Sequence, residues 1–244
     1  MKRTLVLLGL IAAPWLFSSC QKDSETEELF SKQSTKPKFS TAKFDNSTNI
    51  VAIDWSDVNQ KFYYWSTQGF AIFGTYNDTD PVGSSAYAFT LAPGKIPSDI
   101  VETAIYAPVG GGVNKVFTYY YDGTVSSGIS NDLDSYTAPT PYSCPTGYNP
   151  SNIVGMSITS QGNLFTWYND GKVSVGNSTN HTNLYNVTAP TSYSLPPGKT
   201  YSQIIAMAFD RNNNNLVYTW FTDGTVSKGS SIDLDAIAAP VAFD

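Results

Sequence analysis

The pattern of hydrophobic residues divides most of this chain into short segments that recur four times, about 50 residues apart. Each copy begins with a run in which large apolar residues alternate with small ones; these runs start at Ile50, Ile100, Ile153 and Ile204. Alternation with a period of two predicts a β-strand, because successive side chains point to opposite faces. The small residues indicate that the strands crowd around a common axis.

A second strand, rich in aromatic residues, follows each first strand after a polar loop. It ends at a turn on Gly69, Gly123, Gly171 or Gly224, and an aspartate precedes the last three of these glycines. Asp-Gly favours a tight hairpin, because glycine tolerates the positive φ of such turns. A short third strand and an Ala-Pro segment follow, and proline suits an outer edge strand.

One copy is too small to bury its own apolar face, so the copies must pack on one another. The predicted repeats span approximately residues 49–99, 100–152, 153–203 and 204–244. Four copies of a four-stranded unit predict an all-β fold, a four-bladed β-propeller over residues 46–244. An open stack of the same units is the alternative architecture.

The N-terminal residues are typical of a secretion signal. Two basic residues precede an apolar run from Leu5 to Phe17, and small residues lead from it to Cys20. The run is short for a transmembrane helix. Its end resembles the lipobox of bacterial lipoproteins, in which cleavage leaves a lipid-modified cysteine. We expect residues 1–19 to be a lipoprotein signal peptide and Cys20 to carry lipid, with an ordinary signal peptide as the alternative.

Residues 20–45 are expected to form a lipid-anchored tether. The acidic residues just after Cys20 resemble the export signal that sends lipoproteins of the Bacteroidetes to the outer face of the outer membrane. The alternative is a solvated acidic segment without a targeting role. The resemblance implies an outer-membrane protein that faces the cell exterior and contacts the membrane only through its lipid.

The repeat itself also resembles a known module. The sequence DGTVS, a following Asp-Leu-Asp and the exit Leu195–Lys199 are similar to a tandem repeat of secreted bacterial and fungal proteins, over residues 49–244. This resemblance implies a non-catalytic propeller and names no ligand. Hemopexin-like four-bladed domains are a weaker likeness, because their closing disulfide has no counterpart here.

Charge and composition exclude several classes of function. Without the leader and its two basic residues, 12 Lys and Arg remain against 20 Asp and Glu, a formal charge of −8, so nucleic acid is not an expected partner. Cys144 is the one cysteine besides Cys20, which leaves no pair for an internal disulfide. The single histidine, His181, is expected to be solvated, and neither a zinc site nor a Ser-His-Asp triad can be assembled.

Carboxylate catalysis needs only two acids, so a glycan-active hydrolase is the third hypothesis for function. Asp122, Asp170 and Asp223 recur in register with the repeat. Turn geometry accounts for these aspartates without catalysis. We therefore expect no catalytic residue and no enzyme activity.

An aromatic ladder on the second strands is the first candidate ligand site. Its members occupy the same repeat position: Trp65, Tyr119, Trp167 and Trp220. Aromatic faces bind the apolar faces of sugars. Second strands of stacked sheets are also buried on both faces and carry large residues for packing alone. Packing is the favoured role, and ligand binding is the alternative.

Polar loop residues between the blades are the second candidate ligand site. They are Asn131, Asp132, Asn180, Asn183 and Asp233, whose amides and carboxylates could bond sugar hydroxyls. The loop acids at 132 and 134, and at 233 and 235, also have an Asp-x-Asp spacing found in calcium loops, without a third ligand.

Two acids interrupt the small positions of the first strands. If the small side faces the axis, Asp54 and Glu102 face a central channel from adjacent blades. Their oxygens could hold a calcium ion there. The alternative is a pair of acids in water at the channel mouth.

These features together predict a surface lipoprotein that binds an extracellular glycan or glycoprotein. The alternative is a structural or protein-interaction module of an envelope assembly.

Overall fold

The computed structural model describes residues 49–57, 59–78, 86–107, 114–213 and 216–243, which belong to one compact unit, Ala42–Asp244. Four antiparallel four-stranded sheets make up its regular structure, and the described residues contain no α-helix. The signal peptide, Cys20 and the tether of residues 20–45 lie outside the described residues.

Each sheet is one blade, and its strands follow one another from the axis outward. Blade 1 contains β1 (Ile50–Ser56), β2 (Lys61–Ser66), β3 (Phe70–Gly74) and β4 (Tyr87–Ala88). Blade 2 contains β5 (Ile100–Tyr106), β6 (Lys115–Tyr120), β7 (Thr124–Ile129) and β8 (Asp132–Pro141). Blade 3 contains β9 (Ile153–Ile158), β10 (Asn163–Tyr168), β11 (Lys172–Asn177) and β12 (Thr188–Ser192). Blade 4 contains β13 (Ile204–Asp210), β14 (Leu216–Phe221), β15 (Thr225–Gly229) and β16 (Ala238–Ala242). The short 3-10 helices η1 (Pro97–Asp99), η2 (Pro150–Asn152) and η3 (Tyr201–Gln203) precede the inner strands of blades 2, 3 and 4.

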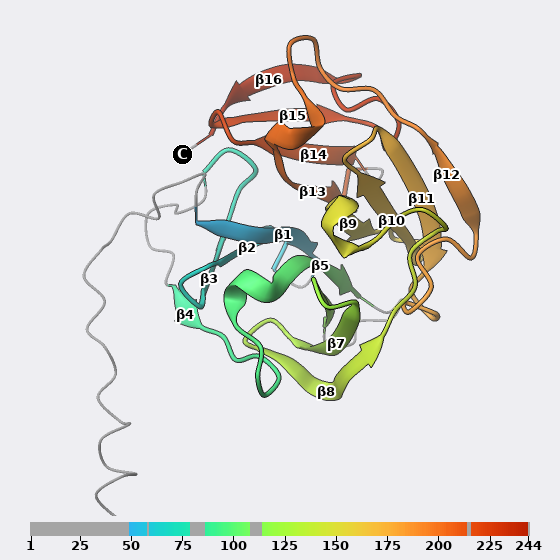
Figure 1. Ribbon diagram of the computed structural model, residues 1–244. Coiled ribbons are helices and arrows are strands. Elements are labelled where there is room, and N and C mark those ends of the chain that lie inside the picture. The colour runs from blue at the N-terminus through green and yellow to red at the C-terminus, as the bar shows by residue number, and fades with distance from the viewer. Residues whose placement is uncertain (1–48, 58, 79–85, 108–113, 214–215, 244) are drawn as a thin grey trace, which may run out of the picture. The chain divides into compact units, whose positions relative to one another are not determined.

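The four blades close into a ring. The inner strands β1, β5, β9 and β13 contact one another in that order, and β13 also contacts β1. Figure 1 shows these strands in the middle of the molecule and β4, β8, β12 and β16 at its perimeter. The four-bladed propeller is therefore confirmed, and the open stack is wrong.

The small residues of the inner strands have a different role from the expected one, because they face the next blade. A Cβ added at Gly155 of blade 3 would lie 2.6 Å from the Cβ of Met207 in blade 4. Ala206 and Ala208 of blade 4 pack in one cluster with Ile53 of blade 1. Small residues on one blade thus make room for large residues on its neighbour, which gives the close packing of a protein interior.

The hydrophobic core consists of four clusters, and each is shared by two adjacent blades. We call the contact between two adjacent blades a seam, so the molecule has seams 1–2, 2–3, 3–4 and 4–1. Each seam buries apolar area that one blade alone would leave in water, so the blades stabilise one another.

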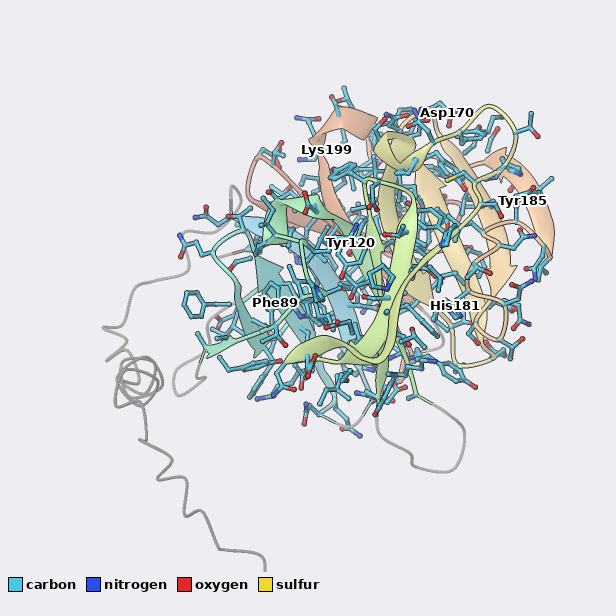
Figure 2. The ribbon with its side chains drawn as sticks, turned by 60° about the horizontal axis from the view of Figure 1, so that its bottom comes forward. Phe89, Tyr120, Asp170, His181, Tyr185 and Lys199 are labelled. Carbon is cyan, nitrogen blue, oxygen red and sulfur yellow. The ribbon has the colours of Figure 1, made fainter. Side chains whose placement is uncertain are left out.

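The two ends of the propeller carry different connections. The Asp-Gly hairpins and the 3-10 helices lie where the inner strands begin, which we call the turn face. The loops after the first and third strands of each blade lie at the opposite end, the loop face. Figure 2 shows Asp170 and Lys199 of the turn face at the upper edge of the molecule, and His181 of the loop face in its lower half. The chain enters β1 from the turn face.

Candidate functional site

The aromatic ladder lies in the core. Trp65, Tyr119, Trp167 and Trp220 each have 0% of their surface exposed. Each donates a hydrogen bond across its seam to a backbone carbonyl of the next blade. The bonds join Trp65 Nε1 to Ser130 (3.2 Å), Tyr119 Oη to His181 (3.0 Å), Trp167 Nε1 to Ser231 (2.9 Å) and Trp220 Nε1 to Tyr76 (2.9 Å). The ladder therefore has the packing role and offers no surface to a ligand.

Two of the turn aspartates hold adjacent blades together. Lys95, at the exit of blade 1, forms an ion pair with Asp122 of blade 2 and lies 4.5 Å from the ring centroid of Tyr120. Lys199 of blade 3 pairs in the same way with Asp223 of blade 4. Hydrogen bonds from these lysines lower the pKa values of both aspartates.

The third turn aspartate makes the same contact with a different partner. Tyr148 occupies the position of the two lysines in the exit of blade 2, and its hydroxyl donates to Asp170 Oδ2 over 2.8 Å. Its ring lies 4.2 Å from that of Tyr168. Because each turn aspartate belongs to a different blade, the structure does not bring two of them into one catalytic pair.

Asp54 and Glu102 do lie together near the axis, but they are buried and not in water. Their exposed fractions are 0% and 1%. Asp54 accepts hydrogen bonds from the backbone N–H groups of Trp55 and Ile105 and from the hydroxyl of Ser157. Glu102 Oε1 accepts from the N–H groups of Ile53 (3.2 Å) and Thr103 (3.1 Å). The acids thus bond N–H groups on the inner edges of blades 1 and 2.

These contacts do not suit a calcium ion, which needs six to eight oxygen ligands. Both oxygens of Asp54 and Oε1 of Glu102 already accept hydrogen bonds, and the described residues include no cluster of three His, Cys, Asp or Glu side chains that could hold a metal. Burial raises the pKa of Asp54 to about 7, although Arg211 lowers it, and burial also raises the pKa of Glu102 well above its usual value. A bound cation would oppose both shifts.

Arg211 is the axial residue that sequence reasoning missed. It follows β13, and its side chain is 3% exposed. Nη1 donates to the carbonyls of Ile105 (2.7 Å) and Ile158 (2.8 Å), and Nη2 donates to that of Trp55, while Nε donates to Asp57. One guanidinium of blade 4 therefore binds the inner strands of the other three blades. A basic residue directly after an inner strand was the available signal.

The predicted loop residues lie on the loop face, but on three different seams. Asn131, Asn180 and Asp233 are exposed, and Asp132 and Asn183 are partly exposed. The backbones of Asp132, Asn183 and Asp233 pair with the segment that leaves the preceding blade, through the parallel bridges Thr90–Asp132, Ser143–Asn183 and Ser194–Asp233. The Asn131 carbonyl accepts from Thr90 N–H of that segment, whereas Asn180 bridges to Asn177 of its own blade. The structure thus repeats one polar rim position three times and does not gather the five residues into one site.

The acids of these loops lie in pairs. Asp132 interacts with Asp134, and Asp233 with Asp235; burial and the neighbouring carboxylate raise the pKa values of Asp134 and Asp235. Two carboxylates that repel each other on one exposed loop, without a third ligand, do not form a metal centre.

His181 was expected to be solvated, and this prediction is wrong. Its ring stacks on Phe117 of blade 2 with centroids 4.3 Å apart and an interplanar angle of 22°. Burial, with a smaller contribution from Lys115, lowers the pKa of His181 to about 4. A neutral ring at seam 2–3 has a packing role, and no acid or nucleophile is bonded to it among the described residues.

No family model and no curated protein matches this chain. Solved structures with a similar fold include a symmetrical protein from work on de novo evolutionary emergence (10% identity, TM-score 0.41), which covers 76% of this chain and 73% of its own. PorZ, a surface component of the type-IX secretion system of Porphyromonas gingivalis, is 12% identical with a TM-score of 0.30 over 80% of this chain and 20% of PorZ. A protein of Bacteroides thetaiotaomicron is 12% identical with a TM-score of 0.40, over 81% of this chain and 44% of its own. The chain thus spans about a fifth of PorZ and less than half of the Bacteroides protein. Within the described residues, no helix has the length and apolarity to span a bilayer.

Proposed function

We propose that this chain is a lipid-anchored surface protein of the outer membrane, and that its propeller binds a glycan or glycoprotein outside the cell without catalysing a reaction. The rim of the loop face is the observation that carries the proposal. It presents an amide or a carboxylate side chain at one equivalent position on three seams, at Asp132, Asn183 and Asp233, and each of these residues is fixed by a backbone bridge to the preceding blade. Fixed polar groups of this kind suit the hydroxyls of a saccharide.

The remaining chemistry supports a binding role over a catalytic one. The ladder is buried, the turn aspartates bond across the seams, and the two axial acids accept backbone hydrogen bonds. A pair of carboxylates flanking an open cleft, which a glycosidase needs, is not found among the residues that the structure describes.

The function is tested by applying the unit Ala42–Asp244 to a glycan array, beside a variant with Asn131, Asn180 and Asp233 all replaced by Ala. We expect binding by the parent and a loss of at least tenfold in the variant, with an unchanged melting temperature because these side chains are exposed. The absence of binding to every glycan would contradict the function. The anchor is tested separately: Cys20→Ala should release the full chain from membranes, and unchanged membrane association would contradict lipidation.

A protein-interaction module is the second candidate, and one observation favours it. Tyr136, Val187 and Ile237 occupy the same repeat position on three blades and are 51%, 53% and 60% exposed. Three apolar side chains around the perimeter could contact an envelope partner. If this candidate is right, replacing the three by Ser should release the protein from an envelope complex isolated from cells, without changing glycan binding.

A further inference from the structure

One aromatic ring at each seam lies nearer the loop face than the ladder, two residues before the ladder member on the same strand. The four rings are Tyr63, Phe117, Phe165 and Tyr218. Three of them are buried, with 7%, 1% and 3% exposed for Tyr63, Phe117 and Tyr218. Phe165, at seam 3–4, is only partly buried. The seams are therefore not equivalent at this position.

The difference follows from what covers each ring. At seam 2–3 the ring of His181 stacks on Phe117, and at seam 4–1 the ring of Tyr76 stacks on Tyr218, with centroids 4.8 Å apart. Both covering residues also supply the backbone carbonyl that accepts the ladder hydrogen bond. The same position holds Ser130 at seam 1–2 and Ser231 at seam 3–4.

Tyr63, which faces Ser130, is covered by its own blade. Phe73 and Tyr87 lie 5.9 and 6.3 Å from it. Phe165 has no such cover: Val175 is paired opposite it, at the position of Phe73 in blade 1. The described ring contacts of Phe165 are to Trp167 and Phe209, both in the buried core of the seam. Phe165 is thus only partly buried, and the residue that corresponds to His181 and Tyr76 at this seam is Ser231, which has no ring to stack on it.

Two amides lie beside this ring on the same face of blade 3. Asn163 precedes Phe165 by two residues, and Asn177 is paired directly opposite Asn163. Opposite residues of antiparallel strands project to one face, so the amides adjoin the pair Phe165 and Val175. Asn177 Oδ1 accepts from Thr179, which leaves its N–H groups available, and the side chain of Asn163 makes no hydrogen bond to the described residues.

The charge of the residue at the position of Asn163 also differs between seams. Lys61 and Lys115 occupy the position of Asn163 in blades 1 and 2, and their ammonium groups lie 5.0 Å from the Phe73 and Phe117 rings. In blade 4, Lys228 lies 5.4 Å from the Tyr218 ring. At seam 3–4 none of the lysines that the structure describes lies over the Phe165 ring, so this surface combines an aromatic face with uncharged amides. That composition complements a neutral ligand with one apolar face and several hydroxyls.

We propose that seam 3–4 holds a single binding site for the pyranose ring of an uncharged sugar. The sugar stacks its C–H face on Phe165, and the amides of Asn163 and Asn177 bond its hydroxyls. The site rests on the proposed glycan-binding function and deepens it, because it names the one seam, the platform and the charge of the sugar. The site requires a small residue at position 231, because a side chain larger than that of Ser231 would occupy the space of the sugar.

The repeat supplies a matched test. Ser231→His copies the covering residue of seam 2–3 and should close the site, whereas Ser130→His is the control, because Tyr63 is already covered by Phe73. The probes are methyl glycosides of glucose, galactose, mannose, fucose and N-acetylglucosamine, with saturation-transfer NMR and titration on the unit Ala42–Asp244. Ser231→His should weaken binding of the recognised glycoside at least tenfold, and Ser130→His should change it less than twofold. Phe165→Leu keeps apolar bulk without a flat ring and should also weaken binding at least tenfold; its melting temperature is measured beside it, because the ring also contacts Trp167 and Phe209.

The outcomes separate this site from the wider function. If a glycoside binds equally to the parent, Ser231→His and Phe165→Leu, the site is overturned while glycan binding stands. If only acidic glycans on the array bind, the assignment of an uncharged sugar is overturned and the function stands. If no glycan of either kind binds the parent, both the function and the site are overturned.

Discussion

At the four seams this propeller makes one contact four times, whereas at its axis each blade contributes a different side chain. Every seam has a ladder residue whose polar tip donates to a carbonyl of the next blade. The axis instead joins Asp54, Glu102, Ser157 and Arg211, one from each blade. The repeated contacts bury the apolar face that each blade has. The axial contacts pair the backbone groups on the inner edges of the four inner strands, which meet at one place only.

Loss of a ladder residue should have the largest effect. Trp220→Ala removes a fully buried indole and its hydrogen bond at the seam that closes the ring, and should reduce the free energy of unfolding by about 3–5 kcal/mol. Denaturant titration measures this change in the free energy of unfolding. Tyr121→Ala, whose ring is 53% exposed, is the control and should cost no more than about 0.5 kcal/mol. A loss below about 1 kcal/mol for Trp220→Ala would show that the ladder is not core.

Removal of the axial arginine should come next. Arg211→Met keeps part of the aliphatic stem but leaves the carbonyls of Trp55, Ile105 and Ile158 without their donor. Because unpaired buried carbonyls are costly, we expect a loss of about 3 kcal/mol. Lys172→Met, which removes an exposed contact to Ser192, is the matched control. Equal stability of the two variants would contradict the axial role.

Buried Asp54 should give the protein an unusual pH dependence. Its pKa of about 7 in the folded state exceeds the ordinary value of 3.8, so the folded protein binds the proton more tightly and stability falls as pH rises from 4 to 7. The slope is at most about 1.4 kcal/mol per pH unit. His181 acts in the opposite direction, because its folded pKa of about 4 makes stability fall as pH drops below 6.5.

The two contributions can be separated by comparing His181→Asn with the double variant His181→Asn, Asp54→Asn between pH 4 and 7. The single variant should lose stability with rising pH more steeply than the double variant. Glu102, Asp57 and Arg211 remain in both proteins, so the two variants differ only at residue 54. Parallel pH profiles would contradict the raised pKa of Asp54.

The ion pairs of the turn face should have the smallest effect. Lys199→Met removes the contacts to Asp223 and to the Phe221 ring, 4.8 Å away, and should cost about 0.5–1 kcal/mol because the carboxylate is largely solvated. The lowered pKa of Asp223 means that this stability is present above pH 4 and is lost as the carboxylate is protonated. If Lys199→Met lowers the free energy of unfolding by the same amount at pH 3 and pH 7, the ion pair contributes nothing to stability.

The repeated part of the fold could be predicted from the sequence, and the unrepeated part could not. Period-two strands and Asp-Gly turns are local signals, and they predicted four four-stranded units. The direction of the small residues was wrong because alternation shows that a strand has two faces, not which face meets the next blade. Arg211 and the stacking of Tyr76 on Tyr218 depend on contacts between residues far apart in the chain, which ring closure alone brings together.

The candidate site shows the same limit. The predicted rim residues are at the surface, but their division over three seams follows from the placement of the blades. The open ring of Phe165 could be recognised only after Ser231, Tyr76 and His181 were found at equivalent positions, because the repeat is too irregular there to align by sequence.

The central claim is that the loop face binds a ligand while the seams, the axis and the turn face hold the structure together. Hydrogen exchange of the unit Ala42–Asp244, with and without a glycan selected on the array, tests it most directly. We predict slower exchange on binding in the loop-face segments 163–165, 177–180 and 230–234 of seam 3–4, and unchanged exchange in the hairpins at Gly123, Gly171 and Gly224. Protection confined to those hairpins would place the ligand on the turn face and contradict the account.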